Sequence, residues 1–265
     1  MKDKHLNKIG IKQLIRLEWL DRTLSLLLAG MSPEEIRRDL SDYLADKKPS
    51  GGIGERGYKT YTLAIAILSA WFDPAIQWHS LRDKLLVQAR QLPPEEWMVL
   101  HWTLMLAAYP FWFNVAIQTG RVCALQERVT RKQIFDRLIE RYGERSTILR
   151  YARYVIRSFK AWKILEDTEI RGCYQKGASI PISNPQIMGL LFEAMLISTQ
   201  GNKAPLRSLA YSPALFPFIL ATERAPQAVA SNPALVGERL GDGEMMVYLQ
   251  NDIDKDDLSK RIEHN

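Results

Sequence analysis

Cysteine is scarce in this chain, with 2 among 265 residues. Cys123 and Cys173 lie far apart, with no Cys-x-x-Cys spacing and no neighbouring histidine pair, so the pattern indicates neither a disulfide framework nor a zinc site. Histidine is scarce too, and His79 and His101 have no second ligand at a metal-binding spacing. We therefore expect two reduced, buried thiols, no metal and no cofactor.

A secretion signal is also missing, because residues 1–12 are polar and basic and no apolar core with a small-residue cleavage site follows them. We expect a cytoplasmic protein. The 24 residues from Trp97 to Gly120 carry no formal charge, and about 20 apolar residues can cross a bilayer. Asn114 and Gln118 interrupt this run, however, and Pro110 divides it after Tyr109. The pattern favours two consecutive core helices and no membrane partner.

A phosphate-binding loop is suggested by Gly-x-Gly-x-x-Gly at residues 52–57, but its context is wrong. Dinucleotide and P-loop motifs follow a β-strand, whereas the sequence of residues 44–50 predicts a helix end and a turn. A P-loop also needs lysine directly after the last glycine, where Tyr58 stands and displaces Lys59 by one position. We expect a connection between helices here rather than a nucleotide site.

Paired catalytic carboxylates are not indicated either. Glu34 and Glu35 follow Ser32-Pro33, and a serine cap, a first-turn proline and acidic residues near the positive end of the helix dipole account for this pattern without chemistry. Glu95 and Glu96 follow two prolines in the same way. With no nucleophile and base pair in view, we expect that the chain is not an enzyme.

Acidic side chains are absent between Arg145 and Lys163, and this absence marks the most informative stretch. From Arg121 to Lys163 there are 12 Lys or Arg against 4 Asp or Glu, whereas the whole chain carries a net charge of +6. The rest of the chain is therefore net negative. Basic residues that cluster in one segment favour a polyanionic partner, because phosphate binding depends on local cation density.

The same stretch predicts a helix, a tight turn, a longer helix and a short two-stranded wing. Thr130 can cap the first helix and Gly143 ends it. In the second helix, apolar residues at spacings of three and four predict a buried face, made by Ile148, Ala152, Val155, Ile156 and Phe159. Short apolar and polar runs with Gly172 and Gly177 then predict strands and turns as far as Ile182.

This order of elements resembles a winged helix-turn-helix, and it predicts the residues that contact nucleic acid. The outer face of the longer helix carries Arg150, Arg153, Arg157 and Lys160. Ser146 and Thr147 at its start can donate to a phosphate. The remaining expected contacts are Arg131 and Lys132 on the first helix and Arg171, Gln175 and Lys176 in the wing. We expect double-stranded DNA rather than RNA, and little sequence preference.

The predicted fold class is mainly α. We expect a helical bundle over 1–128, a winged-helix-like nucleic-acid-binding region over 129–182, C-terminal helices with a β-hairpin over 183–250, and a charged tail over 251–265. One bundle helix should run from Ile9 to Ala29. Strands should be confined to the wing and to the hairpin from Val236 to Leu249, where Asp242-Gly243 is a typical two-residue turn.

The layout is similar to that of the BrxA accessory proteins of BREX phage-defence systems, whose N-terminal bundle is like that of the antitermination factor NusB. The resemblance rests on two segments, LMLAA at 104–108 and STILR at 146–150, the second lying ahead of Ile164-Leu165. It implies a non-enzymatic DNA-binding component of a bacterial defence system, with other proteins of that system as partners. The segment from Pro205 onward has no counterpart in that layout.

An alternative function remains open, that of a protein–protein adaptor in a larger complex without nucleic-acid contact. The apolar segment from Leu206 to Leu220 would then be the contact surface. Salt separates the two functions, because phosphate binding weakens steeply as salt rises and apolar protein binding does not.

Overall fold

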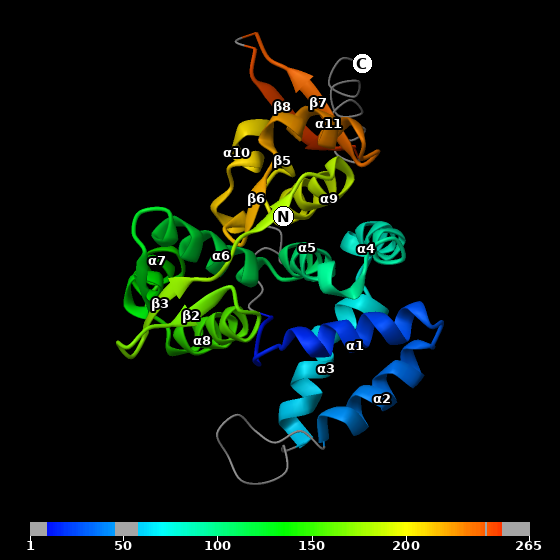
Figure 1. Ribbon diagram of the computed structural model, residues 1–265, viewed down its shortest axis with the longest axis vertical. Helices are drawn as coiled ribbons and strands as arrows, with labels where there is room; N and C mark the ends of the chain where they lie inside the picture. Colours follow the sequence, from blue (N-terminus) through cyan, green and yellow to red (C-terminus); the bar gives the residue numbers. More distant parts are fainter. Residues whose placement is uncertain (1–9, 46–57, 242, 251–265) are drawn as a thin grey trace, which may run out of the picture.

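The computed structural model describes residues 10–45, 58–241 and 243–250, and it is mainly helical with a few short strands (Figure 1). The predicted mainly α fold is thereby confirmed. The Gly-x-Gly-x-x-Gly motif, the charged tail, residues 1–9 and Asp242 lie outside the described residues.

Helices make up the N-terminal half. They are α1 (Leu17–Leu28), α2 (Pro33–Ala45), α3 (Tyr58–Phe72), α4 (Ile76–Ala89), the short 3₁₀ turn η1 (Pro94–Glu96), α5 (Met98–Ala108) and α6 (Pro110–Cys123). The expected cap at Ser32 is present: Glu35 N–H donates to Ser32 Oγ at 3.3 Å, and Ser32 N–H donates to Glu35 Oε2 at 2.7 Å. This reciprocal pair accounts for Glu35.

The prediction of a helix from Ile9 is wrong in its first part, because α1 begins at Leu17. Ile11 and Ile15 are nevertheless fully buried. The backbone N–H of Ile15 donates to Ser158 Oγ at 2.9 Å, and the indole N–H of Trp162 donates to the Ile15 carbonyl at 3.0 Å. These contacts with α8 (Ser146–Ala161) and with Trp162, the residue that follows it, satisfy the Ile15 backbone in place of a helical turn.

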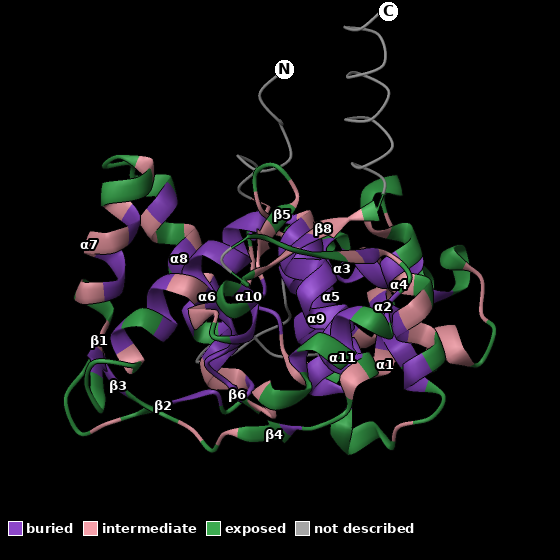
Figure 2. Cartoon of the chain, turned by 90° about the horizontal axis from the view of Figure 1, so that it is seen from above, coloured by how far each residue is buried: buried purple, intermediate pink, exposed green. Residues whose placement is uncertain are grey.

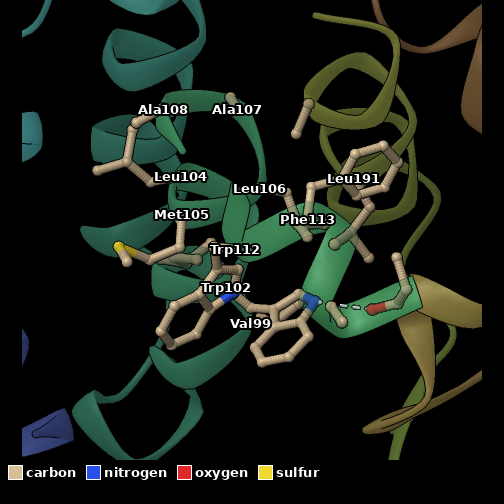
Figure 3. Close-up of a cluster of buried hydrophobic side chains, with 14 of the residues drawn as sticks. Val99, Trp102, Leu104, Met105, Leu106, Ala107, Ala108, Trp112, Phe113 and Leu191 are labelled. Atoms are coloured by element: carbon tan, nitrogen blue, oxygen red, sulfur yellow. Dashed lines mark hydrogen bonds between the residues drawn. The ribbon is translucent and has the colours of Figure 1, made fainter. Parts of the chain in front are cut away.

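The uncharged run forms two core helices, as expected. Every residue of α5 is buried, Tyr109 leaves the helical conformation, and Pro110 begins α6. Trp102 and Trp112 lie side by side at a centroid distance of 5.6 Å (Figure 3), and the Trp102 indole donates to the Ala214 carbonyl at 3.2 Å. None of the described helices combines the length and the apolar character that a bilayer span requires.

The middle of the chain forms a small helical and stranded unit after α6. Its elements are β1 (Arg128–Thr130), α7 (Arg131–Tyr142), α8, β2 (Leu165–Asp167) and β3 (Cys173–Lys176). The strands make an antiparallel sheet in the order β1-β3-β2. The hairpin of β2 and β3 agrees with the expectation, whereas β1 was not expected as a strand.

The C-terminal third alternates short helices and strands. It comprises β4 (Ile180–Ile182), α9 (Pro185–Ile197), β5 (Lys203–Pro205), α10 (Leu206–Ala210), η2 (Pro213–Leu215), β6 (Phe218–Leu220), η3 (Thr222–Arg224), α11 (Ala225–Ala230), β7 (Leu235–Arg239) and β8 (Met245–Leu249). The expected hairpin is present, since β7 and β8 pair antiparallel. The expectation that strands are confined to the wing and this hairpin is wrong, because β1, β5 and β6 lie outside both; β6 pairs with β4, and β5 with β8.

A single buried cluster of apolar side chains runs through all three parts of the chain. Helix α9 packs on α4 and α5, so that the C-terminal third is built into the bundle. Figure 2 shows α5 and α9 as mostly buried, while α7 is largely intermediate and exposed. Most of the apolar residues between Leu206 and Leu220 face this core, and Tyr211 and Ile219 are the large apolar side chains exposed there.

Candidate nucleic-acid interface

The start of α7 is fixed in position by local and long-range hydrogen bonds. Gln133 N–H donates to Thr130 Oγ1 at 3.2 Å, and Thr130 N–H donates to Gln133 Oε1 at 2.8 Å, which is a capping box. The cap predicted at Thr130 is confirmed. In addition, Arg131 N–H donates to the carbonyl of Gly172 at 2.8 Å. The loop between β2 and β3 is therefore attached to the first turn of α7.

Helix α8 buries the face that the sequence predicted. Ile148, Ala152 and Phe159 have no exposed surface, while Val155 and Ile156 are buried beside them. Gly143, with a φ of 78°, ends α7 as expected and lets the chain turn. Ser146 and Thr147 occupy the first two positions of α8 and are exposed, as are Arg150, Arg153 and Arg157.

The four cations expected along α8 lie on one side of the helix but have different surroundings. At 100° per residue, Arg150 and Arg157 point away from the buried face, whereas Arg153 and Lys160 turn toward the side of α8 that contacts α7 and β2. Lys160 Nζ lies 2.6 Å from Asp167 Oδ2 on β2 and 5.7 Å from the centre of the Tyr174 ring. Lys160 is therefore a partly exposed cation whose charge is already paired with Asp167 of the same chain.

Lys132 has a comparable partner, since its Nζ lies 2.7 Å from Asp136 Oδ2 one turn along α7. Both groups are largely exposed, so this pair contributes little to stability. Its effect is to hold the ammonium group near the start of α7.

Four of the predicted contacts come together around one pocket of about 400 Å³. We call it the basic pocket, and its cationic lining is Arg131, Lys132, Arg153 and Arg171. These side chains come from α7, α8 and the loop between β2 and β3. Within the described part of the chain, no carboxylate forms an ion pair with any of the three arginines.

The ring of Phe135 positions two of these arginines. The guanidinium carbons of Arg131 and Arg153 lie 6.0 Å and 5.7 Å from its centre. A cation over an aromatic face is attracted to the ring, and the contact restricts an otherwise mobile side chain. Sequence reasoning missed Phe135, although its spacing of four residues from Arg131 places the two on the same helix face.

The three predicted wing residues do not form one cluster. Arg171 joins the basic pocket, while Lys176 is exposed at the other end of β3. The side-chain amide of Gln175 donates to Glu166 Oε2 at 3.0 Å, across the β2–β3 pair.

Burial raises the pKa of the Cys123 thiol, which lies near Lys176, to about 11, and the charge of Lys176 opposes the shift. That thiol is therefore protonated at neutral pH and a poor nucleophile.

No protein-family model, curated protein or solved structure matches this chain. Among the described residues, no three His, Cys, Asp or Glu side chains lie together in a way that could hold a metal ion.

Proposed function

We propose that this protein binds nucleic acid, double-stranded DNA in preference to RNA, through α7, α8 and the β2–β3 hairpin. The observation that carries the proposal is the convergence of cations from these three elements on one side of a small unit. The succession α6, β1, α7, α8, β2 and β3, with the sheet order β1-β3-β2, supports a winged helix-turn-helix.

Helix α8 is the element that docks in this proposal. Arg150 and Arg157 extend from its outer face, and its first turn presents Ser146 and Thr147 with backbone N–H groups. The positive end of a helix dipole and free N–H groups bind phosphate well. The backbone of one strand therefore passes the start of α8, and the arginines contact phosphates farther along the helix.

The basic pocket adds contacts beside this helix. Arg131, Arg153 and Arg171 have no carboxylate partner among the described residues, so their charge is available to a phosphate. Lys132 and Lys160 contribute less, because Asp136 and Asp167 already compensate their charge. Gln175 holds Glu166 and serves the hairpin rather than the ligand.

Phosphate contacts dominate this interface. The outer face of α8 carries arginine, serine and threonine but no Asn, Gln, Asp or Glu, which are the usual partners of adenine and cytosine edges. We expect little sequence preference and strong dependence on salt. With about six phosphate contacts, affinity falls by roughly a thousandfold between 50 and 200 mM salt.

The proposal includes no catalytic step and assigns the protein an accessory role beside other proteins, as in a bacterial phage-defence system. A protein–protein adaptor is the competing function. The burial of most of the segment from Leu206 to Leu220 reduces the apolar surface that an adaptor would use.

A fluorescence anisotropy titration with a short labelled duplex tests the proposal. The variant Arg150→Ala/Arg153→Ala/Arg157→Ala removes three exposed charges from α8, and we expect the magnitude of the salt slope to fall by about three. The matched control, Arg90→Ala/Arg207→Ala/Arg239→Ala, removes three exposed charges elsewhere. Circular dichroism verifies that both variants are folded. Equal affinity of the α8 variant and the wild type overturns the proposal and favours the adaptor.

A further inference from the structure

The basic pocket has two chemically different parts. Arg131, Lys132, Arg153 and Arg171 supply positive charge, and Asp136 is the single acidic residue of its lining, so four cations and one carboxylate leave a formal charge of +3. The remaining lining includes Phe135, Ile139, Leu149 and Ile170, which are apolar. A ligand that fills the pocket must combine a strong anion with an apolar group.

Ile170 is the clearest sign that the apolar part serves a ligand. It lies in the loop between β2 and β3, lines the basic pocket and is 58% exposed. The loop is not free to move away, because the carbonyl of Gly172 accepts the N–H of Arg131 and Cys173 N–H donates to the Ile170 carbonyl at 2.9 Å. The apolar surface is therefore held open beside the arginines.

A regular duplex uses only half of this pocket. Its phosphates lie on a convex surface and its bases are stacked inside, so a duplex can reach the arginines but offers nothing apolar to Ile170 and its neighbours. An unpaired nucleotide carries both groups, a phosphate and a flat base that stacks on apolar side chains or on guanidinium planes. A volume of about 400 Å³ lies within the usual range of small-ligand pockets.

We propose that the basic pocket binds one unpaired nucleotide of a single-stranded overhang next to a duplex. This inference rests on the proposed function and narrows its ligand to duplexes with an unpaired end. Arg131 and Arg153, held over Phe135, and Arg171 from the loop bind the phosphate. The base packs against Ile170 and the aliphatic residues beside it. Helix α8 binds the adjoining duplex.

Three labelled probes test this inference by anisotropy: a blunt duplex, the same duplex with a short thymidine overhang, and the same duplex with an abasic overhang of equal length. The last two have the same number of phosphates, so they differ only in the bases. The wild type should bind the thymidine overhang about tenfold more tightly than the abasic overhang, which is the usual contribution of one stacked base. Overhangs on the 5′ and the 3′ strand are compared separately.

Two single substitutions locate the effect. Ile170→Ser should abolish the preference for thymidine over abasic overhangs, whereas Ile219→Ser, at a similarly exposed isoleucine on β6, should leave that preference as it is in the wild type. Arg150→Ala should lower the affinity for all three probes by a similar factor. Equal binding of the thymidine and abasic probes by the wild type, or a preference that survives Ile170→Ser, overturns the inference. Failure of all three probes to bind instead overturns the proposed function.

Discussion

The backbone N–H of Ile15 donates to the hydroxyl oxygen of Ser158, 2.9 Å away and 143 positions later in the chain. The same hydroxyl donates to the Tyr154 carbonyl at 2.9 Å. One buried side chain thus joins the segment before α1 to the helix proposed to dock on DNA.

Ser158→Ala should lower the free energy of unfolding by about 1–3 kcal/mol, because it leaves the N–H of Ile15 buried without a partner. Ser25→Ala is the matched control, since Ser25 also donates to the carbonyl four residues earlier but is exposed. Urea denaturation measures both variants. Equal decreases in the free energy of unfolding would show that the hydrogen bond from Ile15 to Ser158 contributes nothing to stability.

His101 should make stability depend on pH. Trp71 donates its indole N–H to His101 Nδ1 at 3.1 Å, so the proton of the neutral ring sits on Nε2, 3.0 Å from Asp21 Oδ1. Burial lowers the pKa of His101 below its ordinary 6.5, although Asp21 opposes the shift. The unfolded chain therefore binds more protons, and the stabilisation present above pH 6.5 decreases as the pH falls below that value.

Urea denaturation between pH 8 and pH 5 tests this expectation. His101→Phe removes the titrating group, so its stability should fall less steeply than that of the wild type below about pH 6.5. Parallel curves for the two proteins would contradict it.

Stability should depend on Lys84, because its ammonium group is the counter-charge of the buried Glu193 carboxylate. Its Nζ lies 2.7 Å and 2.6 Å from the two carboxylate oxygens, and Asn232 Nδ2 donates to Oε2 at 2.7 Å. Lys84→Met leaves Glu193, which is 3% exposed, without a counter-charge. This substitution should lower the free energy of unfolding by about 3 kcal/mol. The double variant Lys84→Met/Glu193→Leu should recover part of this loss. A double variant less stable than Lys84→Met would contradict the argument.

Gly120→Ala should destabilise the contact between α6 and η2. An added Cβ would overlap the carbonyl oxygen of Pro213, which is backbone and cannot turn aside. We expect a loss of at least about 2 kcal/mol, measured as a lower Tm. Gly241→Ala is the control, because nothing lies within 4 Å of its added Cβ. A Tm shift no larger than that of the control would show that the two elements can separate without cost.

Lys160 and Arg157 should contribute unequally to DNA binding, although both were expected on the same face of α8. Asp167 compensates the charge of Lys160, whereas Arg157 is exposed. Arg157→Ala should therefore weaken duplex binding more than Lys160→Ala, and Asp167→Asn should strengthen it. Anisotropy at low salt measures all three variants. A larger effect of Lys160→Ala would place the docking face on the β2 side of α8.

Local signals in the sequence determined where several helices begin or end. The Thr130 cap, Gly143, the Ser32-Pro33 start of α2 and the division at Pro110 all appear in the structure. Each depends on interactions between residues a few positions apart, or on the conformational preference of one residue, so the sequence is sufficient to predict it. The buried face of α8 was predictable for the same reason, because helical periodicity is local.

Only the tertiary structure decided which distant groups meet. The segment before Leu17 carries a helical pattern of apolar residues, but contacts with Ser158 and Trp162 hold it out of a helix. The pairing of β4 with β6 depends likewise on residues far apart in the chain. In the candidate site the sequence identified the cations but not their arrangement. The β2–β3 loop is hydrogen-bonded to the start of α7, and this contact brings Arg171 close to Arg131 and Arg153. Lys160 instead forms an ion pair with Asp167 on β2. The sequence could not predict these contacts, because packing rather than periodicity sets the distances between separate elements.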